Sequence, residues 1–203
     1  MHIIQTARAP NPRRVRIFLA EKKVEMRFEE LDLMSSELKS ESFTKLNPWQ
    51  RVPILILDDG RVLSETVAIC RYFEEINPKP ALMGEGAFGR ANVEMWQRRV
   101  EQGLFQSVAH VFRHLHPRMS HLEVPQVQAW GEANRLKVDD ELARLDKQLA
   151  NSPFVAGESY SIADITAFVA VAFMKPAKLE ISPSLFNITR WRDAMSARPS
   201  AHA

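Results

Sequence analysis

The sequence predicts an α/β domain with the element order β-α-β-α-β-β-α, followed by an all-α domain. Residues 1–77 mix short apolar runs with helical spacing, whereas residues 90–203 carry apolar residues at three- and four-residue steps and no strand signal. Between them, the stretch around residues 78–89 is rich in proline and glycine, which is the composition of a linker. We therefore expect two domains, residues 1–77 and 90–203, joined by this linker.

The first three elements form a β-α-β unit. Residues 2–5 are short and partly apolar, residues 13–22 carry apolar side chains at helical spacing, and residues 26–33 approach strict alternation. A strand, a helix and a second strand in this order imply a right-handed crossover and a parallel strand pair.

A hairpin and a helix complete the first domain. After a short polar helix or loop that ends at Asn47-Pro48, the apolar runs 54–57 and 62–63 flank the turn at 58–60. Because the turn ends in Asp-Gly, these runs predict a β-hairpin. The following helix has one apolar face and stops before Pro78.

The second domain is predicted from helical periodicity alone. Apolar residues indicate a long amphipathic helix over 93–115, a second helix over 138–149 and a third over 162–173. Ser161 precedes the third helix and Asp164 follows three residues later, which is a capping-box pattern with a structural role.

Composition excludes several classes of function. A net charge of +2 is too small to favour nucleic acid or an anionic membrane, and the arginine-rich stretch 13–16 lacks interleaved aromatics. A single cysteine, Cys70, excludes an intrachain disulfide and a Cys-x-x-Cys redox pair. Without a signal-peptide pattern or a membrane-spanning apolar stretch, we expect a cytoplasmic protein.

A metal site is not expected. His110 and His114 are four residues apart on the long predicted helix, but only Glu123 offers a nearby carboxylate, and Pro117 interrupts the helix before His121. We interpret these histidines as a polar face near a cleft.

Two short segments point to a ligand. Val52-Pro53 opens an apolar run, and its X-Pro bond is a candidate cis peptide that would turn the Val52 amide and carbonyl toward an extended peptide. Glu65 and Thr66 stand where a helix begins, so free N–H groups can hold a carboxylate while Glu65 neutralises an ammonium. The γ-glutamyl end of glutathione carries all of these groups.

These segments, with residues 10–17 and 161–164, resemble soluble glutathione S-transferases of the bacterial type. The resemblance implies a thioredoxin-like first domain, a helical second domain and a homodimer. It also implies that glutathione binds and that its thiolate attacks a hydrophobic, electrophilic small molecule. The glutathione-binding residues would be Lys39, Gln50, Arg51, Val52, Pro53, Glu65 and Thr66. Lys39 can equally be a solvated helix lysine.

The expected thiol-activating group is missing. In the family, a serine, tyrosine or cysteine in the loop before the first helix stabilises the thiolate, but here those positions are Ala9 or Pro10. The remaining donors are Asn11, our first choice, then Thr6 and Arg8. An asparagine before a proline is also a common turn or N-cap residue.

The long helix is expected to line the acceptor cleft. Its candidates are Met95, Gln102, Gln106 and His110, although spacing alone does not separate cleft from core. Two alternatives to a transferase remain: a glutathione-dependent peroxidase or disulfide reductase, and a non-catalytic glutathione-binding protein.

Overall fold

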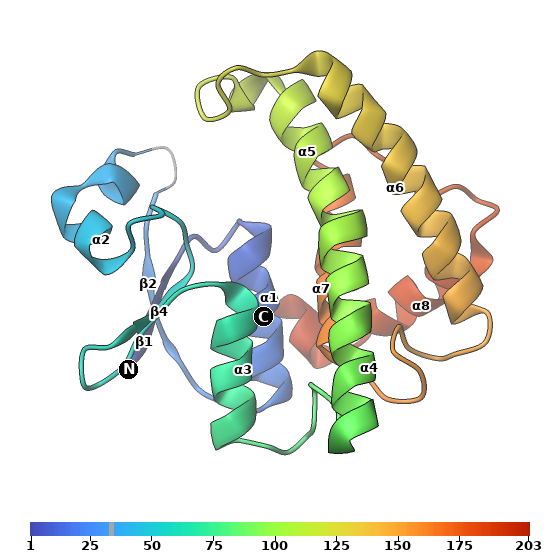
Figure 1. Ribbon diagram of the computed structural model, residues 1–203, viewed down its shortest axis with the longest axis horizontal. Coiled ribbons are helices and arrows are strands. Elements are labelled where there is room, and N and C mark those ends of the chain that lie inside the picture. Colours follow the sequence, from blue (N-terminus) through green and yellow to red (C-terminus); the bar gives the residue numbers. More distant parts are fainter. Residues whose placement is uncertain (33–34) are drawn as a thin grey trace. The chain divides into compact units, whose positions relative to one another are not determined.

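The computed structural model describes residues 1–32 and 35–203 (Figure 1). The chain forms two compact units, Met1–Leu82 together with His202–Ala203, and Met83–Ala201. The boundary after Leu82 lies within the stretch that the sequence suggests as a linker. Among the described residues, no helix has the length and apolar character needed to cross a membrane.

The first unit is a four-stranded mixed sheet with helices. Strand β1 pairs in parallel with β2 and antiparallel with β3, which pairs antiparallel with β4, giving the order β2-β1-β3-β4. The predicted element order, parallel pair and hairpin are confirmed. The elements are β1 (His2–Gln5), α1 (Pro10–Glu21), β2 (Arg27–Glu30), η1 (Glu37–Lys39), α2 (Glu41–Leu46), β3 (Ile54–Ile56), β4 (Val62–Leu63) and α3 (Thr66–Ile76).

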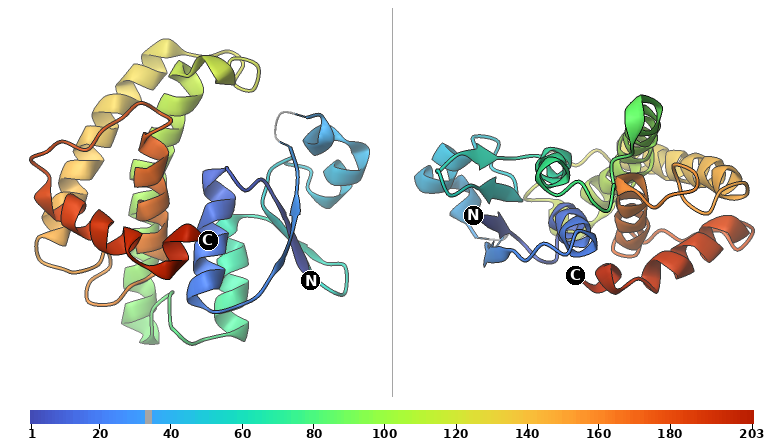
Figure 2. Two further views of the ribbon diagram at one scale, coloured as in Figure 1. Left: turned by 180° about the vertical axis from the view of Figure 1, so that it is seen from behind. Right: turned by 90° about the horizontal axis from the view of Figure 1, so that it is seen from below.

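Helices cover both faces of this sheet. Helices α1 and α3 lie side by side on one face (Figure 2). On the other face, Ile4 and Ile54 are paired across the strands and pack with Phe43 of α2 in one buried cluster. Since successive strand residues point to opposite faces, the neighbouring Ile3 and Leu55, both fully buried, face the other way.

Two boundaries in this unit differ from the prediction. Helix α1 begins at Pro10, three residues early, because proline suits the first helical turn, where an N–H has no helical partner. Strand β2 is shorter than the predicted 26–33; its four residues are exposed at the sheet edge, so burial does not impose alternation on them. Leu33, part of that predicted strand, lies outside the described residues.

The second unit is helical, as predicted. Helix α7 is buried along most of its length and packs against α4, η2, α5 and α8, while α5 and α6 run side by side (Figure 1). The elements are α4 (Gly86–Arg99), η2 (Val100–Phe105), α5 (Gln106–Leu115), η3 (Pro117–Met119), α6 (Gln128–Leu149), α7 (Ile162–Met174) and α8 (Phe186–Ser196). The last element, η4 (Pro199–His202), begins in this unit, and its final residue is counted with the first unit.

The long predicted helix is interrupted by a change of winding. Segment η2 is a π-helix between α4 and α5. Helix α6 starts ten residues before the predicted 138–149, because its first turns are largely exposed and carry no clear apolar stripe. Helix α8 was not predicted, although Ile188, Trp191 and Met195 are buried at helical spacing.

The predicted capping box is present at the start of α7. The Ser161 Oγ accepts a hydrogen bond from the Ala163 amide, and the Asp164 carboxylate accepts one from the Ser161 amide. The Val155 amide and the Trp191 Nε1 donate to the other carboxylate oxygen at 2.8 and 3.0 Å. Complete burial raises the pKa of Asp164 to about 6, although these hydrogen bonds act to lower it.

Candidate functional site

The N-terminus of α3 presents free hydrogen-bond donors. The helix begins at Thr66, and its first backbone hydrogen bond runs from the Ile69 amide to the Glu65 carbonyl at 2.9 Å. Within the described chain, the amides of Thr66, Val67 and Ala68 therefore have no acceptor, and no side chain caps them. This is the arrangement that holds an anion at a helix terminus.

Glu65 has a backbone conformation that is unusual for its residue type. Its φ of 66° and ψ of 119° lie in a region that non-glycine residues rarely occupy. Its side chain is exposed and makes no hydrogen bond or ion pair with the described residues. A free carboxylate thus stands at the edge of the donors of α3.

Thr66 has a buried partner on the neighbouring helix. Its side chain is 7% exposed, and its Oγ1 accepts a hydrogen bond of 2.9 Å from the NH1 of Arg14 on α1. The sequence pattern draws attention to Thr66 only as a ligand contact. The sequence did not predict that Arg14 contacts Thr66, because Arg14 is one of three arginines in a short stretch and nothing in the pattern separates it from the other two.

Among the described residues, the backbone of Val52 is unpaired, and the buried side chain of Asn47 holds the loop that contains it. The Val52-Pro53 bond is cis, as predicted, and Val52 makes no backbone hydrogen bond within the described residues. Asn47, 3% exposed, donates from Nδ2 to the Arg51 carbonyl and accepts from the Trp49 amide. Asn47 was not among the predicted site residues, and its position before a proline is the only signal for it.

The other predicted glutathione contacts have mixed surroundings. The Gln50 side chain donates to the Thr44 Oγ1 at 3.1 Å, so part of its donor capacity is used within the loop. Arg51 is exposed next to Val52, and Lys39 is exposed on η1. Their contacts with glutathione stay predictions.

The loop before α1 is anchored to strand β2. The Thr6 hydroxyl donates to the Leu31 carbonyl at 2.6 Å, and the Ala7 amide donates to the Glu30 carboxylate at 2.9 Å. Arg16 of α1 donates to the Ala7 carbonyl at 2.8 Å. Since the Thr6 hydroxyl already has this structural acceptor, its hydrogen is less available to a thiolate.

Asn11 is the second residue of α1, not its N-cap. The N-cap is Ala9, which has no side-chain cap, and the partly buried Asn11 side chain makes no hydrogen bond with the described residues. Pro10 and Pro12 lack an N–H, and the Arg13 amide donates to the Ala9 carbonyl at 3.3 Å. The Asn11 amide is therefore the one free backbone donor in this described turn. Arg8 lies exposed just before it.

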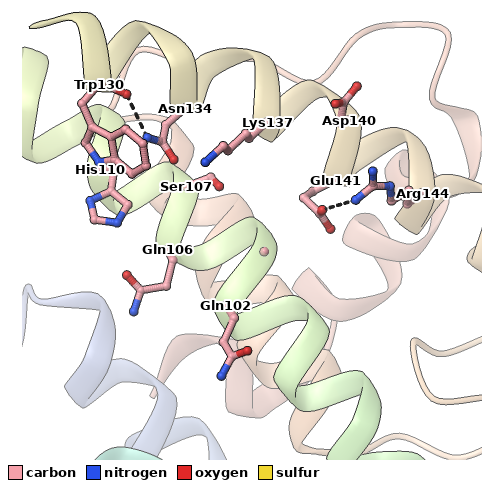
Figure 3. A pocket seen from close by; sticks show the side chains of 11 residues that line it. Gln102, Gln106, Ser107, His110, Trp130, Asn134, Lys137, Asp140, Glu141 and Arg144 are labelled. Carbon is pink, nitrogen blue, oxygen red and sulfur yellow. Dashed lines mark hydrogen bonds and ion pairs between the residues drawn. The ribbon is translucent and has the colours of Figure 1, made fainter.

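The second unit contains a pocket of about 620 Å³ between α6 and the η2–α5 segment (Figure 3). Three of the four predicted acceptor-cleft residues, Gln102, Gln106 and His110, are in its lining. The other lining residues are Gly103, Ser107, Trp130, Asn134, Lys137, Asp140, Glu141 and Arg144. The lining is richer in polar and charged groups than the apolar cleft that the sequence suggests.

Aromatic and charged groups alternate along this pocket. The His110 ring meets the Trp130 ring edge-on at 5.6 Å, and the Lys137 Nζ lies 4.5 Å from the centre of the Trp130 ring. Burial, with Arg113, His114 and Lys137 nearby, lowers the pKa of His110. At neutral pH its imidazole is therefore uncharged and can accept or donate a hydrogen bond.

The π-helical segment explains why Met95 is not in the pocket lining. Met95 lies on α4, 39% exposed, whereas Gln102 belongs to η2. Regular helical spacing would put both residues on one face. A π turn takes up about one extra residue, which rotates the following helix by about 100° relative to the preceding one.

Comparisons with known proteins agree with this description. Family models for the N-terminal and C-terminal domains of glutathione S-transferase match residues 9–76 and 109–199. Glutathione S-transferase 2 of Saccharomyces cerevisiae is 33% identical, over 98% of this chain and 87% of its own length. These names favour the transferase over the peroxidase, reductase and binding-protein alternatives.

Solved structures agree over the full chain. The crystal structure of a glutathione S-transferase domain-containing protein from Marinobacter aquaeolei has a TM-score of 0.95 at 35% identity, covering 98% of this chain and 99% of that one. The structure of Gtt2 from Saccharomyces cerevisiae also has a TM-score of 0.95, at 33% identity, with 100% and 99% covered. This chain therefore belongs to the glutathione S-transferase family and is a glutathione transferase.

Proposed function

We propose that the first unit binds glutathione between the Val52 edge and the N-terminus of α3. The free amide and carbonyl of Val52 pair with the cysteinyl backbone of glutathione as a short strand. The open amides of α3 and the Thr66 hydroxyl receive the γ-glutamyl carboxylate, and Glu65 faces its ammonium. Pro53 fixes the entry to β3, and Lys39, Gln50 and Arg51 supply donors to the ligand's carboxylates.

The observation that carries this proposal is the uncapped first turn of α3 next to the free Glu65 carboxylate. An ammonium and a carboxylate on one carbon match this pair of opposite charges at a helix terminus.

Calorimetric titration with glutathione tests the site. Glu65→Ala removes the only partner proposed for the ammonium, so we expect the affinity to fall about tenfold or more. Glu75→Ala, which removes an exposed carboxylate from the C-terminal part of the same helix, is the matched control. Equal affinities in wild type and Glu65→Ala would refute the assignment.

The chemistry proposed for this site is stabilisation of the glutathione thiolate, followed by its attack on an electrophile. A free thiol with a pKa of about 8.5 is only about 3% ionised at pH 7. Lowering that pKa by two units requires about 2.7 kcal/mol of preferential thiolate stabilisation. The Asn11 side-chain amide and the free Asn11 backbone N–H at the start of α1 are the proposed donors.

The pocket of the second unit is the proposed acceptor site. Its Trp130 and His110 rings favour a flat, unsaturated small molecule, and the amides of Gln102 and Gln106 orient polar substituents. Steady-state rates with a panel of aromatic electrophiles test this role, since Gln106→Leu should change the KM for the acceptor and leave the KM for glutathione unchanged.

Homodimer formation and a cytoplasmic location are also proposed. Large exposed aromatic side chains support the dimer, among them Trp49 at 75% and Phe88 at 83% exposure. The single, buried Cys70 is compatible with a reducing compartment. Light scattering behind a sizing column measures the oligomeric state.

A further inference from the structure

The backbone of Ala7, in the loop that leads into α1, is held by two charged side chains. Its amide donates to the Oε2 of Glu30 at 2.9 Å, and its carbonyl accepts a hydrogen bond of 2.8 Å from the Nη2 of Arg16. Glu30 is the last residue of β2, and Arg16 lies on α1. The loop is therefore tied at one residue both to the sheet and to the helix that follows it.

Gln5 joins these contacts into one network. It lies opposite Glu30 in the parallel pair of β1 and β2, so the two side chains share a face of the sheet. The Gln5 Nε2 donates to the Oε1 of Glu30 at 2.6 Å, and the Gln5 Oε1 accepts a hydrogen bond of 2.9 Å from the Nη1 of Arg16. Gln5 is 3% exposed, and a buried amide needs partners for both its donor and its acceptor. We call Gln5, Glu30, Arg16 and the backbone of Ala7 the Ala7 network.

The first turn of α1 does little to fix its own position. Its N-cap residue, Ala9, has no side-chain acceptor, and Pro10 and Pro12 have no N–H. The hydrogen bond from the Arg13 amide to the Ala9 carbonyl is long, at 3.3 Å. The Ala9 amide itself donates to the Thr6 carbonyl at 3.0 Å, so the helix starts directly from the turn that the network holds.

We propose that Gln5, Glu30 and Arg16 are positioning residues for the donors that stabilise the glutathione thiolate at the start of α1. This inference rests on the function proposed above, in which the side-chain and backbone amides of Asn11 hold the sulfur. The three residues act through the turn that precedes Asn11 and do not touch the ligand. Because a hydrogen bond weakens steeply when its donor is misaligned, a loosened turn should leave the bound thiol less acidic.

Substitution of Glu30 separates positioning from a direct effect of charge. A negative charge near a thiol disfavours the thiolate, so loss of the Glu30 charge would by itself lower the pKa of the bound thiol. Positioning predicts a change of the opposite sign. Glu30→Gln removes the charge and also presents an NH2 group to one of the two donors, the Gln5 Nε2 or the Ala7 amide, which breaks one hydrogen bond of the network.

The test titrates the thiolate absorbance of glutathione bound to each variant. Glu30→Gln should raise the thiol pKa by about half a unit, the effect of losing one ordinary hydrogen bond. Arg16→Lys keeps the positive charge but loses the planar fork that reaches Gln5 and Ala7 together, so it should raise the thiol pKa as well. Glu29→Gln is the matched control and should leave this pKa unchanged, because it removes an exposed carboxylate from the opposite face of the same strand.

The pH profile of conjugation separates positioning from damage to the fold. Well below the thiol pKa, a rise of half a unit leaves about threefold less thiolate, so Glu30→Gln should conjugate an aromatic electrophile about threefold more slowly there. Well above that pKa, the variant should regain at least the wild-type rate. The KM for glutathione and the midpoint of thermal unfolding should stay close to wild type, since the network does not include the proposed glutathione contacts.

The two levels of the proposal fail differently. If wild-type glutathione is acidified on binding, an unchanged or lowered thiol pKa in Glu30→Gln would overturn only the positioning role, and so would an equal rise in Glu29→Gln. A wild-type bound thiol that still titrates near its free pKa of about 8.5 would overturn the proposed thiolate stabilisation, and the role of the network with it. If Glu30→Gln does not fold, Arg16→Lys decides, because a charge effect alone predicts no shift for it.

Discussion

At the scale of single residues, the amide of Asn11 is the side chain that replaces the missing hydroxyl in our proposal. Removing it should raise the pKa of the bound glutathione thiol by about one unit or more, because a hydrogen bond to a charged group contributes roughly 1.5–3 kcal/mol. The thiolate absorbance of bound glutathione, titrated with pH, measures this in Asn11→Ala. Thr6→Val is the comparison, since the Thr6 hydroxyl already donates to Leu31. An unchanged thiol pKa in Asn11→Ala would remove Asn11 from the mechanism.

The backbone conformation of Glu65 predicts that the residue lowers the stability of the fold, although its carboxylate is proposed to bind glutathione. Its positive φ is unfavourable for any residue with a Cβ, by about 1 kcal/mol or more, and glycine relieves that cost. Glu65→Gly and Glu65→Ala both lose the carboxylate and should both bind glutathione weakly. Chemical denaturation should nevertheless find Glu65→Gly more stable than Glu65→Ala by about 1 kcal/mol. The reverse order would show that the conformation is not strained.

At the scale of elements, a buried ion pair ties the end of α1 to α3 and to the segment after it. The Lys22 Nζ lies 2.5 Å from the Glu74 carboxylate and donates to the carbonyls of Asn77 and Pro80, both at 2.6 Å. The side chain of Lys22 is completely buried. This cluster fixes the course of the chain as it leaves α3.

Breaking that pair should be costly, whereas replacing both partners should not. Lys22→Met takes the cation away from a buried carboxylate, and we expect a loss of about 3–5 kcal/mol of unfolding free energy. Lys22→Met with Glu74→Leu should lose less than either single variant. Denaturant titrations of the four proteins give the coupling, and a double variant as unstable as the sum of the singles would contradict the expectation.

At the scale of the whole molecule, the buried Asp164 carboxylate accepts hydrogen bonds that join α7, α8 and the loop at Val155. Its shifted pKa makes the free energy of unfolding depend on pH. Its folded pKa of about 6 lies above the ordinary 3.8, so the folded state binds more protons between these values. The contribution of this group to the unfolding free energy therefore falls as pH rises from about 4 to 6, by on the order of 3 kcal/mol in total. The wild-type value minus that of Asp164→Asn should be larger at pH 4.5 than at pH 7. A difference that is independent of pH would mean that the carboxylate stays ionised.

The order of the elements, the cis Val52-Pro53 bond and the helix start at Thr66 could be predicted because they depend on local signals. Apolar periodicity specifies the helices, the Asp-Gly turn specifies the hairpin, and the Thr66 helix start follows from the residue types around it. Arg14 and Asn47 could not be assigned roles, because each depends on a partner that only the folded chain brings close. The Met95 assignment relied on regular helical spacing, whereas η2 is a π-helix and Met95 is not in the lining of the pocket. Its contact with an acceptor stays a prediction.

The π-helical segment η2 also affects the alignment of this sequence with those of its relatives. Because η2 contains about one more residue than the same length of α-helix, a relative with a regular helix there would align correctly only if a one-residue gap were placed inside the helix. Alignment methods discourage such gaps, so positions before or after η2 would be matched one step out of phase. Gly103 marks this place, since a Cβ there would come within 2.8 Å of the Glu141 carboxylate. A comparison of acceptor specificity across relatives should therefore superpose α5 and α6 first and assign equivalent residues afterwards.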